Sequence, residues 1–383
     1  MRLINLLLSA FRKVQKSISV IKNRSNYINR ATYYPKEERK SKNEILKDHL
    51  WFALKYGELE PFYFTYGFDR KELTRDRIMN EYITPYFFFQ RRINYLNFHN
   101  PRYDSFHGKL TGRVITGDKF YFNIFLEKFG IPTPKILLYV KDKVVLYVDS
   151  QLKIDLNLSP ESQLRCFFSL DMDAFAKPSD GQLGNGVFSL RINNKKIFID
   201  DQETTVDKLI SIILSADYLI QERVYQHRKM AELNDSTINS IRLQTVMDKE
   251  GRVYPFGAGL RIGREGSSVD NWAKGGVFVG IDMENGQLKE LGFLKPQYGT
   301  STKEHPDSHV VFNGFDIPFY KEAEALAVKL HKYLYRCHSV GWDIAITENG
   351  PCFIEGNGLW EISLLQAVHG GLKKQVEHFF ICD

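Results

Sequence analysis

One loop of the sequence carries the residue types that hold phosphate groups. Lys177 stands at the root of this loop, and Gly181, Gly184 and Gly186 follow it between two expected strands. Glycine has no Cβ, so backbone N–H groups can close over phosphate oxygens while the lysine supplies a positive charge. The loop lacks the Gly-Lys-Ser/Thr ending of a Walker loop, and the strand after it argues against a Rossmann turn. A purely structural hairpin is the alternative, because tight turns require glycine in any case.

A second segment carries oxygen atoms suited to a divalent cation. Asp343 lies in one expected strand, and Glu355 and Asn357 lie in the next, where alternation places the last two on one face. Mg²⁺ prefers hard oxygen ligands, commonly one or two carboxylates together with waters and substrate phosphates. The alternative is a solvated edge hairpin whose acids have no role, since exposed carboxylates are the rule.

The connection between these two strands decides whether the two acids can meet. A two-residue turn at Asn349-Gly350 would place Asp343 opposite Gly356 and Glu355 on the other face. It would also require a hydrogen bond from Pro351, which has no N–H. We therefore expect a longer or bulged connection, with an odd number of loop residues, that pairs Asp343 with Glu355.

A single arginine lies among apolar residues in the expected strand 239–246. This residue, Arg242, needs an anionic partner if the strand is half-buried. Its guanidinium could stabilise a transferring phosphoryl group, or it could pair with an internal carboxylate. Two polar residues, Gln221 and Glu222, mark the end of the preceding strand. A later polar turn contains Asn271 and the paired glycines Gly275 and Gly276.

A mixed framework of helices and strands is expected around these residues. Residues 118–129 have the apolar spacing of a helix that Gly130 ends, and β-branched runs predict strands at 136–140 and 144–148. A longer helix with one apolar face is expected over 322–337. Short strand-like runs alternate with turns elsewhere, so the sequence predicts an α+β fold.

The composition is that of a folded protein. The chain has 383 residues, enough for two or three domains, with 43% apolar and 26% charged residues. These values exclude wholesale disorder and the collagen and coiled-coil classes. Four scattered cysteines argue against a disulfide framework or a structural zinc site and favour a reducing cytosol. No apolar run reaches the roughly 18 to 20 residues that a spanning helix needs, and no secretory cleavage pattern is found.

The first 50 residues hold the positive charge of the chain. They carry twelve Lys or Arg and four Asp or Glu, a net charge of +8, whereas the whole chain has +6. Residues 1–20 have the spacing of an amphipathic helix with a cationic side. Such a helix could lie on an anionic membrane at the cytoplasmic face. We favour the alternative that its apolar stripe packs on the protein itself, as most amphipathic helices do.

Aromatic residues are frequent from residue 42 to residue 113, in places next to basic ones, as at 88–92. Stacking on nucleic acid is one interpretation of this pattern. No RNP-type or zinc-knuckle pattern accompanies it, so we favour core packing in a mostly helical region and expect no nucleic-acid partner.

Together, the order and spacing of these motifs resemble the ATP-grasp superfamily, and specifically its sugar-transfer-associated group. Asp118-Lys119 followed by residues 130–134 resembles the family's entry into the nucleotide site, which implies that Lys119 contacts phosphate. Lys177 with its glycines resembles the second phosphate lysine and the mobile glycine-rich lid. The resemblance further implies an adenine hinge at Gln221, Glu222 and Val224, a substrate element at Asn271, Gly275 and Gly276, and magnesium ligation by Asp343, Glu355 and Asn357.

The resemblance implies an ATP-grasp fold in which two α+β lobes sandwich ATP. A helical, basic N-terminal region would occupy residues 1–115. The first ATP-grasp part, which contains the glycine-rich lid, would span residues 116–225, and the C-terminal part, which contains the metal site, would span residues 226–383. ATP and Mg²⁺ would be the cofactors, and Lys177 and Arg242 would be catalytic.

The activity implied is that of a ligase that phosphorylates a carboxylate and then joins it to an amine. The partners would be a small-molecule or glycan carboxylate, such as a sugar acid of a capsule or O-antigen, and an amino acid or amine. A kinase-like phosphotransferase and a non-catalytic ATP-binding scaffold are the alternatives. Two residues depart from the family pattern: Gln221, where many members have Glu, and Val269, where Arg often stands.

Overall fold

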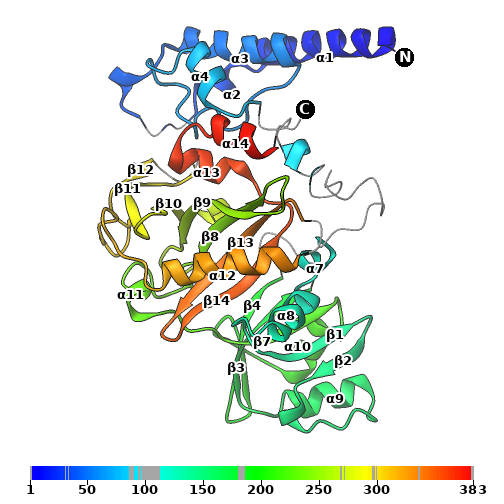
Figure 1. Ribbon diagram of the computed structural model, residues 1–383. Helices are drawn as coiled ribbons and strands as arrows, with labels where there is room; N and C mark the ends of the chain where they lie inside the picture. The colour runs from blue at the N-terminus through cyan, green and yellow to red at the C-terminus, as the bar shows by residue number, and fades with distance from the viewer. Residues whose placement is uncertain are drawn as a thin grey trace.

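The computed structural model shows two antiparallel sheets joined to a helical N-terminal region. It describes residues 2–30, 32, 34–85, 90–93, 96, 113–179, 186–267, 270, 272–295, 298, 300–334 and 337–380. Figure 1 shows the N-terminal helices at one end of the molecule, the sheet of β8 to β14 in the middle and the sheet of β1 to β7 at the other end. The α+β class that the sequence predicts is confirmed.

The first sheet has seven strands in the order β2-β1-β7-β3-β4-β5-β6. Their bounds are β1 (Ile136–Lys141), β2 (Val144–Val148), β3 (Met172–Pro178), β4 (Phe188–Asn193), β5 (Lys196–Ile199), β6 (Gln202–Thr204) and β7 (Tyr218–Glu222). Helices α9 (Pro160–Phe167) and α10 (Val206–Ile213) bury their apolar sides in the core of this sheet. The two strands expected at 136–140 and 144–148 are confirmed as β1 and β2.

The helix expected before these strands is confirmed as α8 (Lys119–Lys128). Asp118 caps its first turn, because the Asp118 Oδ1 accepts hydrogen bonds from the backbone N–H groups of Phe120 (2.8 Å) and Tyr121 (3.3 Å). Gly130 lies just beyond its end with a φ of +65°, a conformation that favours glycine.

The second sheet also has seven strands, in the order β12-β11-β10-β9-β8-β13-β14. Their bounds are β8 (Ile241–Met247), β9 (Val253–Ile262), β10 (Val277–Asp282), β11 (Gln287–Phe293), β12 (Ser301–Thr302), β13 (Ser339–Thr347) and β14 (Gly350–Asn357). The helices of this part are α11 (Arg228–Ala231), α12 (Tyr320–Tyr333), α13 (Ile362–His369) and α14 (Lys373–Phe380). The helix expected over 322–337 thus ends earlier, at Tyr333.

Helices cover both faces of the second sheet. Trp342 and Ile344 of β13 lie in one apolar core with the buried side of α12. On the opposite face, a Cβ added to Gly257 would lie 2.9 Å from the Leu365 Cδ1 of α13, so this helix approaches the sheet closely. Side chains alternate along a strand, so Asp343 points to the face that α13 partly covers.

The segment between α8 and β1 runs along the outer edge of β14. The Phe353 N–H donates to the Pro132 carbonyl at 2.8 Å, and the Thr133 hydroxyl donates to the Phe353 carbonyl at 3.0 Å. Because β14 is the last strand of its sheet, these bonds cover part of that edge and connect the two sheets.

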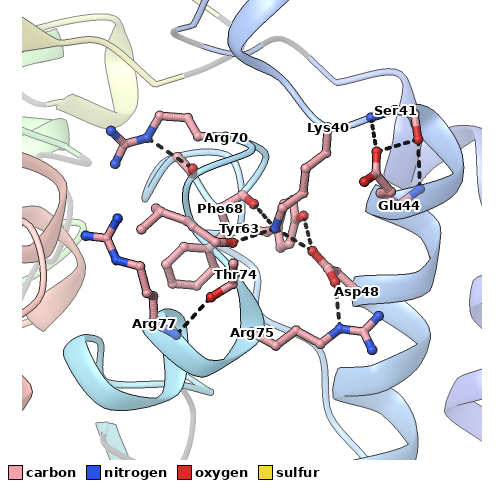
Figure 2. Close-up of polar contacts among 12 residues, drawn as sticks. Lys40, Ser41, Glu44, Asp48, Tyr63, Phe68, Arg70, Thr74, Arg75 and Arg77 are labelled. Atoms are coloured by element: carbon pink, nitrogen blue, oxygen red, sulfur yellow. Dashed lines mark hydrogen bonds and ion pairs between the residues drawn. The ribbon is translucent and has the colours of Figure 1, made fainter.

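The N-terminal region is built from α1 (Arg2–Lys22), α2 (Arg24–Ile28), α3 (Lys42–Tyr56) and α4 (Arg75–Glu81), and a short helix α7 (Arg113–Gly117) precedes α8. A buried ion pair organises it, as Figure 2 shows. The Lys40 Nζ donates to the Asp48 carboxylate at 2.8 Å and to the carbonyls of Phe68 (2.8 Å) and Leu73 (2.7 Å). The same carboxylate accepts from the Tyr63 hydroxyl at 2.8 Å.

The aromatic residues of this region form a core. Phe52, Tyr63, Phe64, Tyr66 and Phe68 are buried in one apolar cluster. Core packing, which the sequence favoured over nucleic-acid stacking, is therefore confirmed for these residues.

The expectation for the first helix is wrong. The residues form an amphipathic helix, α1, but its apolar stripe is exposed and does not pack on the described parts of the protein. Helical periodicity predicts that a stripe exists, but it cannot reveal which side of the helix the rest of the chain covers. Within the described ranges, no helix combines the length and the apolar content that crossing a bilayer requires.

We expect Lys40→Met to lower the free energy of unfolding by about 3 kcal/mol, because the buried Asp48 carboxylate keeps only the partly exposed Arg75 as a cationic partner and the carbonyls of Phe68 and Leu73 lose their donor. Both side chains of the Lys40–Asp48 pair are less than one-tenth exposed. Urea unfolding would measure the change, and Lys42→Met, which removes an exposed lysine two residues away, is the matched control. A loss of under about 1 kcal/mol, the size typical of an exposed pair, would contradict the importance of this interaction.

Candidate active site

Three strands of the second sheet place the predicted acids and Arg242 in one row. Arg242 of β8 pairs with Asp343 of β13, and Asp343 pairs with Glu355 of β14. The predicted pairing of Asp343 with Glu355 is confirmed. Asn357 lies on the same strand as Glu355, and its side-chain Nδ2 is 3.4 Å from the Asp343 Oδ2.

The connection that produces this pairing differs from the expected one. Thr347 pairs with Gly350, so the loop has two residues, and the expected odd-numbered loop is wrong. The register shifts instead within the strands, because Ile344 pairs with Phe353 whereas Asp343 pairs with Glu355. The extra residue of this bulge turns Glu355 to the face of Asp343.

Pro351 is compatible with the short loop because of its place in the sheet. It pairs with Ile346, one position beyond the closing pair of the hairpin. Hydrogen-bonded and non-hydrogen-bonded pairs alternate in an antiparallel ladder, so the missing N–H falls on the outer side of the edge strand β14.

The carboxylate of Asp343 is buried and bound by two arginines. The Arg242 Nε and Nη2 lie 2.6 Å and 3.0 Å from its two oxygens, and the Arg261 Nη1 lies 3.1 Å from one of them. Burial raises the pKa of Asp343, and Arg261 acts in the opposite direction. Of the two partners that the sequence left open for Arg242, the structure shows the internal carboxylate.

A second arginine of the site, Arg261, was not predicted from the sequence. It lies in β9 among apolar residues, which is the same signal that identified Arg242. A further carboxylate, Asp270, interacts electrostatically with Arg261 and accepts hydrogen bonds from the backbone and hydroxyl of Ser240. Burial raises the pKa of Asp270 as well.

Two lysines reach this cluster from outside the second sheet, one from α8 and one from β3 of the first sheet. Lys119, at the start of α8, places its Nζ 3.8 Å from the Glu355 Oε1. Burial lowers the pKa of Lys177, in β3, to about 8; Glu355 opposes this shift, and the positive charge of Lys119 adds to it. The same burial raises the pKa of Glu355, which Lys119 opposes. The two predicted phosphate lysines and Glu355 therefore share one site where the two sheets meet.

The described cluster has a surplus of positive charge. Its members are four cations and three carboxylates: Lys119, Lys177, Arg242, Arg261, Asp270, Asp343 and Glu355. Such a surplus in a partly buried site favours an anionic ligand, and a phosphate group satisfies it.

The predicted metal ligands offer oxygen atoms of the type that Mg²⁺ accepts, and both oxygens of Asp343 already accept hydrogen bonds from arginines. Among the described residues, no three His, Cys, Asp or Glu side chains gather into a metal-binding group. Mg²⁺ needs fewer protein ligands than that when it is also held by phosphates and water. Glu355 keeps a third of its side chain exposed, and burial raises the pKa of both Glu355 and Asp343, so a nearby cation would favour the ionised pair.

The predicted adenine hinge lies at the end of β7. The Gln221 side chain is buried and donates to the Asn123 side chain at 2.8 Å and to the Pro134 carbonyl at 3.1 Å. Its amide group therefore holds the framework together. Glu222 ends the strand and Val224 follows it, and their contact with adenine stays a prediction.

The predicted glycines are described in part. Gly186 has a φ of +74°, and a Cβ at this position would lie 3.0 Å from the Pro178 Cγ, so glycine is required where the loop returns to β4. Gly275 has a φ of +96°, and Gly276 immediately precedes β10. Gly181, Gly184 and Asn271 lie outside the described residues.

Comparison with known proteins gives a family and several similar structures. The family model of the sugar-transfer associated ATP-grasp proteins matches residues 90–379. No curated protein matches the chain.

Among solved structures, the chain is similar to an N5-carboxyaminoimidazole ribonucleotide synthetase in complex with ADP, with 12% identity over 65% of this chain and 46% of that chain and a TM-score of 0.36. The chain is also similar to D-alanyl-alanine synthetase A from Vibrio cholerae, with 12% identity over 73% of this chain and 68% of that chain and a TM-score of 0.38. A third similar structure is D-alanine-D-alanine ligase from Helicobacter pylori, with 12% identity over 70% of this chain and 60% of that chain and a TM-score of 0.40. The chain thus spans less than half of the first of these structures.

We expect ADP binding to weaken about tenfold between pH 7 and pH 9, because Lys177 loses its proton near its pKa of about 8 and a neutral amine no longer attracts phosphate. Calorimetric titration of ADP would measure this change. Lys177→Met should bind more weakly at pH 7 and lose most of the pH dependence, whereas Lys128→Met, at an exposed position of α8, should behave like the unchanged protein.

The low pKa of Lys177 also determines in which direction the stability of the ligand-free protein changes with pH. The pKa of Lys177 is lower in the folded state than its ordinary value of 10.5, so the unfolded chain binds more protons and stability should rise as the pH increases through about 8. An ADP affinity with equal pH dependence in the protein and in Lys177→Met would contradict the assignment of Lys177 to phosphate.

Proposed function

The chain belongs to the sugar-transfer associated ATP-grasp family, and on this premise we propose that it is an ATP-dependent ligase that joins a carboxylate to an amine. The observation that carries the proposal is the convergence of Lys119 and Lys177 on Glu355. The lysines come from α8 and β3 and the carboxylate from β14, so a nucleotide held between the two sheets would meet all three groups.

The proposed reaction has two steps. A carboxylate oxygen of the substrate attacks the γ-phosphorus of ATP, ADP leaves, and an acylphosphate forms. The amine nitrogen then attacks the acyl carbon, phosphate leaves with the bonding electrons, and the nitrogen loses a proton to give the amide. No side chain of the protein has to form a covalent bond, so the site acts by positioning and by stabilising charge.

Each charged group of the site has a role in these steps. Lys119 and Lys177 would bind the phosphates that carry the negative charge. Arg242 and Arg261, held by Asp343, would stabilise charge on the transferring phosphoryl group or on the acyl oxygen. Mg²⁺ held by Glu355, with Asp343 and Asn357, would neutralise phosphate charge when bound.

The substrates proposed are a sugar acid and an amino acid or other amine, in the synthesis of a capsule or O-antigen polysaccharide by a cytoplasmic enzyme. The support for this finer proposal is the association of the family with sugar transfer. The chemistry of the site supports the class of reaction, and it leaves the identity of the carboxylate and the amine to experiment.

The test is a screen of ADP release with pairs of uronic-acid sugars and amino acids. We expect ADP to form in amounts equal to an amide product, and only when both substrates are present. A phosphorylated product that forms without any amine would identify a kinase-like phosphotransferase instead. ATP binding without turnover on any pair would favour a non-catalytic scaffold.

We expect Glu355→Gln to lower magnesium-dependent ATP turnover by at least about 100-fold, because a neutral amide binds the cation and orients the phosphates poorly. The fold should be intact, since the Glu355 side chain is one-third exposed, and circular dichroism would confirm this. Glu284→Gln, at an exposed turn, is the matched control. Turnover of Glu355→Gln equal to that of the control would remove Glu355 from the site.

A further inference from the structure

Helix α1 rests on the protein by one narrow side. Val20 is fully buried, and Ser17 is half-buried with its hydroxyl donating to the Lys13 carbonyl at 2.8 Å. A Cβ added to Gly57, at the end of α3, would lie 3.5 Å from the side chains of Arg12 and Lys13. These contacts fix the rotation of the helix about its axis.

The opposite part of the helix exposes large apolar side chains. Six of them are about half or more exposed: Leu7 63%, Leu8 51%, Phe11 65%, Val14 55%, Ile18 47% and Ile21 59%. Five of the six, Leu7, Phe11, Val14, Ile18 and Ile21, are spaced by four and three residues in turn, so they form one continuous stripe along the helix. We name these five residues the apolar stripe of α1. A contiguous apolar surface of this kind marks an interaction site.

The cationic flank of α1 points elsewhere. Arg12 and Lys16 line a cavity of about 730 Å³, which His49 and Gly57 of the α3 segment also line. The apolar stripe therefore faces away from this cavity. Figure 1 shows α1 along one end of the molecule, at the top of the view, with the rest of the drawn chain on one side of it, so a flat surface could approach the helix.

The charge of the helix identifies the partner. The sequence of α1 contains five Lys or Arg and no Asp or Glu. A second copy of α1 packed on the stripe would bring two such helices together without any carboxylate between them, and like charges would repel. The stripe also covers only about two heptads, whereas a coiled coil needs at least three to four. An anionic lipid surface accepts the apolar stripe and attracts the positive charge of the helix, including the exposed Lys22, which follows Ile18 by one turn.

We infer that α1 lies in the plane of an anionic lipid surface, with the apolar stripe buried at the boundary between head groups and acyl chains. The helix would then hold the N-terminal region at the membrane while both sheets remain in water, with the lysines of the active site on the far side of α13 and α14. This inference rests on the exposure and charge of α1 and is independent of the proposed ligase activity.

The test is co-sedimentation of the full chain with vesicles of phosphatidylcholine, alone or mixed with anionic phosphatidylglycerol. We expect binding to the mixed vesicles at least about tenfold stronger than to the neutral ones. Binding should fall when salt is raised from physiological ionic strength to about 1 M, because the Debye length shortens from about 8 Å to about 3 Å.

Three variants separate the contributions. The double variant Phe11→Ser/Ile18→Ser should lose at least about tenfold in vesicle affinity, because each change removes a large apolar side chain from the lipid. Lys22→Gln, which removes the exposed lysine one turn beyond Ile18, should lose affinity for anionic vesicles and keep its weak affinity for neutral ones. Gln15→Ser, exposed and outside the stripe, is the matched control and should bind like the unchanged protein.

The folding of these variants gives an independent readout. The side chains of Phe11 and Ile18 are exposed, so their replacement should leave the thermal unfolding temperature unchanged. A clear decrease would show that the stripe packs on the protein and would overturn the inference. Equal vesicle binding by the double variant and the control, or no vesicle binding at all, would overturn it too. A dimer in solution that Phe11→Ser/Ile18→Ser dissociates, without vesicle binding, would assign the stripe to a second copy.

Discussion

The pairing of one buried carboxylate with two arginines is the constraint on which the site depends. Asp343 on β13 binds Arg242 from β8 and Arg261 from β9, so three strands are fixed relative to one another by charge as well as by their ladders. A buried carboxylate without such partners would cost several kcal/mol. Because Asp343 has to point at both arginines, the face of β13 is determined, and the bulge then brings Glu355 of β14 to that same face.

From this fixed row the site extends across to the other lobe. Lys119 of α8 and Lys177 of β3 lie outside the second sheet, yet each interacts electrostatically with Glu355. Two lysines and one acid leave the repulsion between the lysines only partly compensated, which is one reason why the pKa of Lys177 is low. A bound phosphate would relieve this repulsion, so the same positive charge of Lys119 that lowers the pKa of Lys177 also favours an anionic ligand.

Much of the framework could be predicted from sequence, and the failures have identifiable causes. The pairing of Asp343 with Glu355 followed from the requirement that both acids share a face, but a bulge inside a regular strand has no local signal, so the loop was assigned the extra residue. The helix predicted to reach residue 337 ends at Tyr333, although Leu334 and Cys337 are buried as its apolar period requires. Arg261 carried the same signal as Arg242 but lies in none of the motifs identified in the sequence. Amphipathic spacing identified α1 and could not show which side is covered.

The outer edge of β14 has a consequence for the behaviour of the protein at high concentration. An open edge strand is a template on which a strand of another molecule can add, and such addition begins aggregation. Here Pro351 offers no N–H, and the N–H of Phe353 is already bonded to the Pro132 carbonyl. The strand that carries Glu355 is therefore closed to intermolecular pairing along this stretch. The segment that connects the two sheets thus also protects the strand that carries Glu355 from the addition of a foreign strand.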